Sequence, residues 1–271
     1  MRQIQITTIL LITVLVFPVV LTAQLAQSAF ETDADGWLSV TLPYPHATPI
    51  SILATNSPLW QAGGYLKLDD PDGSGQTGNV QYWLSPAKFV GAKGAAYGGR
   101  LSFDLRNQGS SFGPFSQEDV ILVGGGLTLV YQLTNSPSQN VFTHYIVPLT
   151  ATGWKRDSLT GPAATPAELQ SALSALSRLF IRAEYQLGPD TEYLDNVILC
   201  AVVPLNISTA GTNVVLSWSQ SACDAVLERS DLLGSAAVWS PEGSLPVVIG
   251  NDFAVTNGVT GTSRFYRLRF P

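Results

Sequence analysis

Hydrophobic and polar residues alternate in short runs along most of the chain, and turns rich in Gly, Pro, Asn, Asp and Ser separate these runs. In residues 101–106, Leu101, Phe103 and Leu105 alternate with polar residues, which is the pattern of a strand with one buried face. Residues 120–133 hold two apolar runs joined by three glycines, which predicts a β-hairpin because glycine permits positive φ in tight turns. Further strands are expected at 142–149, 181–185 and 195–200.

One segment has helical periodicity. Thr165 is a good N-cap, Pro166 suits the first helical position, and Glu168 completes a capping box. Apolar residues then recur at helical spacing at Leu169, Leu173, Leu176 and Phe180. The sequence therefore predicts a helix over 165–180 that packs against a sheet.

A second series of short strands begins near residue 204 and runs to the end of the chain. The segments expected to form them are 213–218, 225–230, 245–250, 252–256 and 265–270. We therefore expect a second, smaller β module over 204–271. A module of this size is marginally stable alone, so docking or a disulfide is expected to stabilise it.

Residues 1–29 have the order of a secretory signal peptide. A basic start at Arg2 precedes an apolar run from Ile6 to Leu21, and small and polar residues follow. Cleavage is expected between Ala23 and Ala29, and a retained membrane anchor is the alternative. No later segment is long and apolar enough to cross a bilayer, so we expect a secreted or extracytoplasmic mature chain without a membrane span.

Composition and charge narrow the class of partner. The chain has 271 residues, of which 45% are hydrophobic, and this composition excludes a disordered protein. Its 14 basic and 20 acidic residues give a net charge of −6, with no basic patch. Nucleic acid and anionic membranes are therefore poor partners on electrostatic grounds.

The two cysteines, Cys200 and Cys223, allow two interpretations. In an oxidising compartment they can form a disulfide, or they can remain unpaired in separate β modules. Two cysteines with His46 and His144 do not have the spacing of a zinc site.

Three stretches of the sequence resemble the laminin B (domain IV) family over about residues 30–200. They are QYWLSPAKFVGAKGAAYGGRLSFDL (81–105), EDVILVGGGLTLVY (118–131), and IRAEY (181–185) followed by LDNVIL (194–199). The resemblance implies an all-β fold, a galactose-binding-like jelly-roll β-sandwich with one inserted helix, similar to carbohydrate-binding modules, extracellular and without enzymatic activity. Flanking cysteine-rich repeats of animal laminins are missing, which argues against a basement-membrane role. Residues 204–271 resemble the small fibronectin type III-like (immunoglobulin-like) β-sandwich of exported bacterial proteins.

The resemblance also implies a structural Ca²⁺ where the first and last strands of the jelly roll meet, with Glu31 and Asp195 as ligands. The alternative is that Asp195 caps a turn and Glu31 is exposed. A second acidic segment, 70–75, is spaced like half of an EF-hand loop, but Gln81 stands where that loop needs a glutamate, so a simple turn is favoured.

The search for a ligand site leaves one aromatic residue to test. The aromatic candidates for stacking on a glycan are Trp60, Tyr65, Tyr82, Trp83 and Trp154. The family resemblance implies that Trp83, Phe89 and Tyr97 are packing residues, and Trp60, beside an expected loop, is the candidate to test.

No constellation in the sequence predicts catalysis. His46 and His144 lie in no catalytic motif, and there is no G-x-S-x-G elbow. The adjacent carboxylates Glu118-Asp119 and Asp69-Asp70 would point to opposite faces of a strand.

We expect a non-catalytic binding or adhesion protein that contacts glycan or an extracellular protein. The alternatives are a structural envelope or matrix component that packs on copies of itself, and an extracytoplasmic hydrolase. The sequence leaves the ligand and the oligomeric state open.

Overall fold

The computed structural model describes residues 20–21, 24–46, 48–70, 78–109, 116–201, 203–219, 223, 225–258 and 263–269. The chain divides into two compact units, a larger one of residues 22–202 and a smaller one of residues 203–271 with 1–21. Most of the predicted signal peptide lies outside the described residues. A search of the described part of the chain finds no helix with the length and hydropathy of a membrane span.

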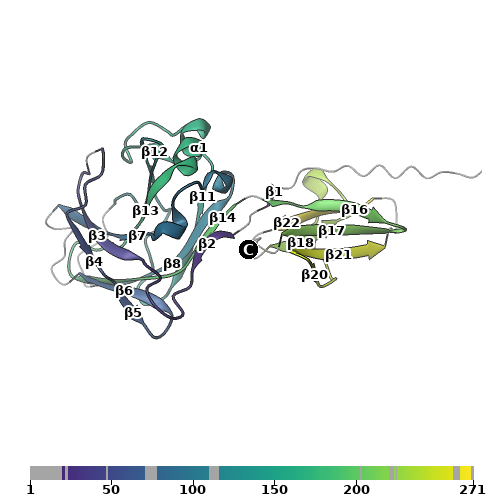
Figure 1. Ribbon diagram of the computed structural model, residues 1–271, viewed down its shortest axis with the longest axis horizontal. Coiled ribbons are helices and arrows are strands. Elements are labelled where there is room, and N and C mark those ends of the chain that lie inside the picture. Colours follow the sequence, from purple (N-terminus) through teal and green to yellow (C-terminus); the bar gives the residue numbers. More distant parts are fainter. Residues whose placement is uncertain are drawn as a thin grey trace, which may run out of the picture. The chain divides into compact units, whose positions relative to one another are not determined.

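The larger unit is a sandwich of two antiparallel sheets (Figure 1), which confirms the all-β class predicted from the sequence. The seven-stranded sheet has the order β12-β10-β9-β13-β7-β3-β4. Its strands are β3 (Leu38–Pro43), β4 (Ala54–Asn56), β7 (Asn79–Leu84), β9 (Val120–Gly124), β10 (Leu127–Tyr131), β12 (Lys155–Arg156) and β13 (Leu176–Arg182).

The second sheet has the order β11-β8-β14-β6-β5, and β2 also pairs with β14. Its strands are β2 (Gln24–Ser28), β5 (Leu59–Gln61), β6 (Tyr65–Asp70), β8 (Arg100–Gly109), β11 (Thr143–Pro148) and β14 (Asp190–Cys200). Strand β8 contains the alternating segment 101–106, and Leu101, Phe103 and Leu105 are fully buried as the pattern predicts. The sequence analysis expected the larger unit to begin at about residue 30. Strand β2 shows that it begins earlier, by Gln24.

The hairpin expected at 120–133 forms between β9 and β10. Gly125 and Gly126 make the turn with φ of 58° and 75°, the left-handed region that glycine adopts readily. A Cβ on Gly124 would lie 2.2 Å from the carbonyl oxygen of Ala172 in the helix, so glycine is also needed there for close packing.

The predicted helix is shorter than expected. Helix α1 covers Pro166–Ser174, and the capping box between Thr165 and Glu168 is present as predicted. Residues from Leu176 onward belong instead to strand β13, which corrects the predicted end at Phe180. The error has a physical cause, because residues 179–182 of β13 are buried on both faces and therefore lack the alternation that would distinguish a strand from a helix.

The smaller unit contains a four-stranded sheet of order β16-β17-β21-β20 and a three-stranded sheet of order β19-β18-β22. These strands are β16 (Asn206–Ala210), β17 (Asn213–Ser219), β18 (Val226–Ser230), β19 (Ser240–Pro241), β20 (Val247–Ile249), β21 (Asp252–Gly258) and β22 (Phe265–Arg269). A further pair joins β1 (Val20–Leu21) and β15 (Val203–Pro204). Trp218 is buried in this unit and packs against Phe253.

Candidate binding surface

The two sheets of the larger unit differ in how their outer faces are covered. The main core lies between the sheets, and a second hydrophobic cluster covers the outer side of the seven-stranded sheet. In that second cluster, Ile50 and Ile52 from the segment before β4 pack over Val40, Tyr82 and Phe180. No such cluster covers the outer face of the other sheet among the residues that the structure describes.

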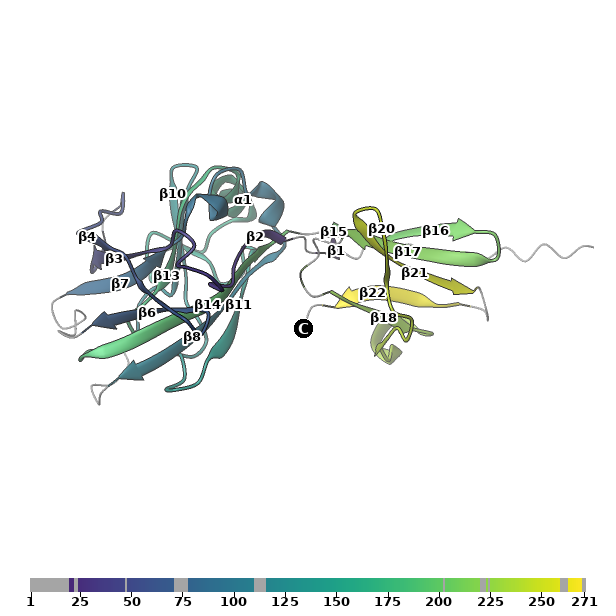
Figure 2. The same cartoon turned by 60° about the horizontal axis from the view of Figure 1, so that its bottom comes forward.

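We call that outer face the open face. It is formed by strands β6, β14, β8 and β11, which lie side by side (Figure 2). Because strand residues alternate between the two sides of a sheet, the positions that flank the buried leucines point outward. The open face comprises Tyr65, Lys67, Asp69, Asp104, Arg106, Gln108, Phe142, His144, Ile146, Thr191, Tyr193 and Asp195.

Aromatic rings surround the guanidinium of Arg106 at the centre of the open face. The guanidinium carbon lies 3.7 Å from the ring centroid of Tyr193, 4.8 Å from that of Phe142 and 5.2 Å from that of Tyr65. The Tyr65 ring also packs edge-on against the other two rings, with 5.7 Å between centroids in each case. Such stacking fixes the orientation of a side chain that is otherwise flexible.

Lys67 and His144, the other basic groups of the open face, each lie against a carboxylate. The Nζ of Lys67 lies 2.9 Å from the carboxylate of Asp69. His144 Nδ1 lies 2.6 Å from Oδ1 of Asp104, and Asn196 donates to the second oxygen of Asp104 at 2.8 Å. Arg106 differs from them, because no described residue accepts a hydrogen bond from its guanidinium and its Nε is buried without a partner.

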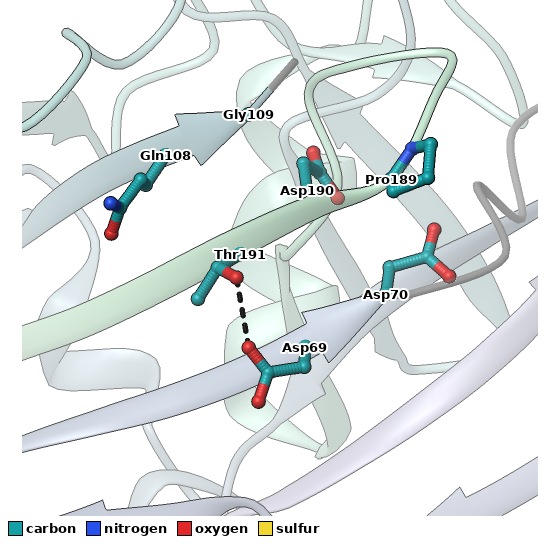
Figure 3. Close-up of a pocket in the computed structure, with 7 residues that line it drawn as sticks. All are labelled: Asp69, Asp70, Gln108, Gly109, Pro189, Asp190 and Thr191. Carbon is teal, nitrogen blue, oxygen red and sulfur yellow. Dashed lines mark hydrogen bonds between the residues drawn. The ribbon is translucent and has the colours of Figure 1, made fainter.

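A cavity of about 600 Å³ lies where β6 and β8 end and β14 begins (Figure 3). Its lining comprises Asp69, Asp70, Gln108, Gly109, Pro189, Asp190 and Thr191. Asp69 accepts a hydrogen bond from the hydroxyl of Thr191 at 2.8 Å, and both lie on the open face. The cavity is therefore continuous with the open face, and we call it the end pocket.

Behind the end pocket, polar side chains point into the sandwich. Asp190 and Glu192 are 6% and 1% exposed, and the amide of Asn107 donates to both carboxyl groups. Burial, followed by smaller effects that include repulsion from Asp70, raises the pKa of Asp190 to about 6. Burial, and then the charge of Asp190, raises the pKa of Glu192 well above its usual value. Asp190 therefore titrates close to pH 6.

The residues predicted to bind calcium lie close enough to interact electrostatically. Burial is the main cause that raises the pKa of Asp195 to about 6, and the charges of Asp104 and Glu31 raise it further. A Cβ on Gly64 would lie 3.7 Å from both the carbonyl oxygen of Ala29 and a carboxylate oxygen of Glu31, so both oxygens lie near this glycine. Oxygen donors of this kind suit Ca²⁺.

The positions of these acidic side chains fit a calcium site less well than their oxygen chemistry does. Within the described ranges, no three Asp, Glu, His or Cys side chains are spaced to hold a metal ion. Asp104 is already engaged by His144 and Asn196, and Asp195 accepts the backbone N–H of Asn196 at 2.7 Å. The EF-hand-like segment 70–75 lies, apart from Asp70, outside the described residues.

Trp60, the predicted sugar-stacking residue, is 38% exposed in strand β5 at the edge of the sheet. Its indole N–H donates to the carbonyl of Phe30 at 2.6 Å, which fixes the ring beside the first turn of the unit. Trp83 and Phe89 are fully buried, and Tyr97 packs against the same core, in agreement with the interpretation of these residues as core residues.

The two histidines lie in different surroundings. His46 is buried against Glu118, at 4.0 Å, and burial lowers the pKa of this histidine. The neighbouring Asp119 pairs with the buried Arg182 at 3.4 Å. His144 lies on the open face. No arrangement among the described residues brings the two histidines together.

Cys200 and Cys223 are 0% and 5% exposed, and both are disulfide-bonded in the structure, so neither is a free thiol.

Sequence analysis missed the cluster around Arg106. The alternation in 101–106 already placed Arg106 opposite the buried leucines, and this was the available signal. Its aromatic neighbours come from positions 65, 142 and 193, and only the pairing of β6, β8 and β14 brings them together.

The fold is similar to that of a laminin domain. The structure of the L4b domain of human laminin alpha-2 superposes with a TM-score of 0.53 at 17% identity, over 66% of this chain and 97% of that domain. At this identity the likeness shows the fold alone. It supports the β-sandwich described above.

Sequence comparison gives the same class of domain. Residues 82–214 match the family model Laminin B (Domain IV). The mouse basement membrane-specific heparan sulfate proteoglycan core protein is 32% identical over 127 residues, and human laminin subunit gamma-1 is 32% identical over 147 residues. These matches cover 46% and 52% of this chain but only 3% and 8% of the two relatives. Over part of its length the chain is therefore similar to laminin B domains.

Proposed function

We propose that the protein is a non-catalytic binding or adhesion module outside the cytoplasm, and that its larger unit contacts glycan or protein partners through the open face. The difference between the two sheets carries this proposal. A hydrophobic cluster covers one outer face, whereas the other presents ordered aromatic and charged side chains to solvent. The matrix proteins among the relatives support an extracellular setting.

A pair of matched variants tests this proposal. Ile146 on the open face is 44% exposed, and Leu53 in the segment that covers the other sheet is 56% exposed. Retention of the full chain is measured on a panel of immobilised extracellular polysaccharides and matrix proteins. The proposal predicts that Ile146→Glu weakens retention and that Leu53→Glu does not. Equal loss in both variants, or no retention of the unaltered chain, would contradict it.

The smaller unit supports a second candidate function, a matrix component that packs on copies of itself. Strand β20 lies at the edge of its sheet, and Val247, Val248 and Ile249 are 56%, 59% and 61% exposed. An exposed apolar edge strand is able to pair with another chain. Sedimentation at increasing concentration should show self-association that Val248→Lys removes, and a strict monomer would contradict this candidate.

We also propose that the smaller unit is fibronectin- or immunoglobulin-like. If β16 to β22 are lettered along the chain as A, B, C, C′, D, E and F, the two sheets have the orders A-B-E-D and C′-C-F. The first is the order of one immunoglobulin sheet, and the second pairs C with F as the other immunoglobulin sheet does. An experimental structure of residues 203–271 tests the topology, and a different strand order would contradict it.

We also propose the structural Ca²⁺ that the family resemblance implies. Glu31 and Asp195 would hold it, together with the carbonyl oxygen of Ala29. The ion would supply positive charge at carboxyl groups that otherwise repel one another.

A further inference from the structure

We propose that the open face binds a carboxylate-bearing saccharide, in which Arg106 holds the carboxylate of a uronic acid and the end pocket accepts a neighbouring sugar. This inference rests on the proposed function and names its ligand class.

Arg106 is the group that recognises the anion. Its guanidinium is stacked 3.7 Å above Tyr193 and flanked by Phe142 and Tyr65, so its orientation is fixed before any ligand arrives. A guanidinium offers a planar set of donors that matches a carboxylate in a two-point contact. A preorganised donor set loses little conformational entropy on binding.

The ion pairs of the open face leave one cation available to an anion. Lys67 is neutralised by Asp69, and His144 lies against Asp104. Asp195 and Asp104 lie opposite each other in register on β14 and β8, one row of side chains away from Arg106. Arg106 is thus the cation without a carboxylate partner among the described residues of this face. Because the whole chain carries a net charge of −6, general attraction of polyanions does not explain an anion site here.

The strip from Arg106 to the end pocket suits the rest of a sugar chain. Gln108 follows Arg106 on the same face of β8, and its side-chain oxygen accepts a hydrogen bond from the hydroxyl of Tyr193 at 2.9 Å. Thr191 and Asp69 follow on the neighbouring strands and line the cavity of about 600 Å³. Amide, hydroxyl and carboxylate groups of this kind bond to sugar hydroxyls, and the cavity has the size of small-ligand pockets.

A protein partner fits this face less well. The core of a protein interface is depleted in Lys, Asp and Glu, whereas this face carries Lys67, Asp69, Asp104 and Asp195. In the described part of the chain, few aliphatic side chains are strongly exposed on this side of the sheet: Ile146 and, on the adjoining strand β5 opposite Lys67, Leu59.

Calorimetric titration of the full chain tests the inference. The probes are short oligosaccharides of galacturonate, of mannuronate and of the glucuronate-containing polymer hyaluronan, each beside its carboxyl-reduced, neutral form. We expect at least one acidic form to bind and its neutral form to bind at least tenfold more weakly. Arg106→Gln should lower affinity for the acidic form about tenfold or more, because a charge-assisted hydrogen bond is lost. Arg106→Lys should fall between the two, since it keeps the charge without the planar donors.

Arg267→Gln is the matched control. Arg267 of the smaller unit also stacks on an aromatic ring, Trp239, at 4.4 Å, but Glu228 already occupies its donors. This variant should bind the acidic form as the unaltered chain does. The melting temperature of each variant confirms folding, and Arg106→Lys serves as the test if Arg106→Gln does not fold.

Equal binding of acidic and neutral forms, unchanged affinity in a folded Arg106→Gln, or binding of none of the acidic probes would overturn the inference. If the chain is nevertheless retained by a neutral polysaccharide or a matrix protein, and Ile146→Glu weakens that retention, the inference fails while the proposed function stands.

Discussion

The indole N–H of Trp37 donates a hydrogen bond to the hydroxyl of Ser28 at 2.8 Å, and both residues are buried. The same hydroxyl donates to Asp35 at 2.7 Å. Ser28 belongs to strand β2, whose pairing with β14 is part of the larger unit. The first strand of the sandwich therefore lies inside the segment that the sequence analysis assigned to the signal peptide.

This relationship predicts where an exported chain is cut. Cleavage after Ser28 or Ala29 would remove β2 and leave the indole N–H of Trp37 buried without its acceptor, at a cost of about 1–3 kcal/mol. We expect the mature chain to begin at Gln24 or earlier. N-terminal sequencing of the exported protein measures this directly, and a folded product that begins at Ala29 or Phe30 would show that β2 is dispensable.

We predict that the raised pKa of Asp190 makes the free energy of unfolding fall as the pH rises. Its pKa is about 6 in the folded protein and near 3.8 when unfolded. Between these values the folded state binds more protons than the unfolded state, so stability falls as pH rises from about 4 to about 6. Asp190→Asn removes the charge and should raise the free energy of unfolding at pH 7.5 by about 1–2 kcal/mol, with a smaller gain at pH 4. Denaturant unfolding at the two pH values measures both.

The matched control for this variant is Asp69→Asn. Asp69 is the exposed neighbour of Asp70 in the end pocket, and hydrogen bonds from Lys67 and Thr191 contribute to lowering its pKa. The control should therefore not gain stability at pH 7.5. If Asp190→Asn destabilises the protein at neutral pH, the carboxylate is favourable where it lies and the assigned pKa shift is wrong.

The calcium proposal predicts a stabilisation that depends on Asp195. An ion bound only by the folded state at a concentration of 100 times its dissociation constant adds about 2.7 kcal/mol. We expect the melting temperature to be higher in Ca²⁺ than in chelator, with the shift lost in Asp195→Asn and kept in Asp190→Asn. Identical melting curves of the unaltered protein in Ca²⁺ and in chelator would remove the proposal.

We predict a disulfide between Cys200 and Cys223, which peptide mapping under non-reducing conditions would detect. Cys200 and Cys223 have 22 residues between them, and closing a loop of this size stabilises the folded state by about 3 kcal/mol in the chain-entropy model. Replacing both with serine should lower the free energy of unfolding by about that amount. Alkylation of both thiols without prior reduction would contradict the link.

Strand β8 and the start of helix α1 could be predicted from the sequence. The alternation of Leu101, Phe103 and Leu105 gave β8 and its inward face, and the capping box at Thr165 gave the start of α1. The end of α1 could not be found, because residues 179–182 are all buried and show no strand period. The calcium ligands Glu31 and Asp195 stay a prediction, and it came from the family resemblance and not from the residue pattern.

Long-range pairing limited the prediction of the candidate site. Arg106 and Tyr193 are 87 positions apart in the chain and meet directly across β8 and β14. Glu192 lies between Thr191 and Tyr193 and could not be recognised as buried, because its inward direction depends on the register of β14. Chemistry that depends on such pairing becomes visible only in the folded structure.

Hydroxyl-radical footprinting of side chains tests most directly whether the open face is the binding surface. It is carried out with and without a polysaccharide or matrix protein that retains the chain. We predict that labelling of Tyr65, Phe142 and Ile146 falls when the partner is added, while labelling of Leu53 is unchanged. Unchanged labelling of the first three residues, with protection of Leu53 or of β20 instead, would place the binding surface elsewhere.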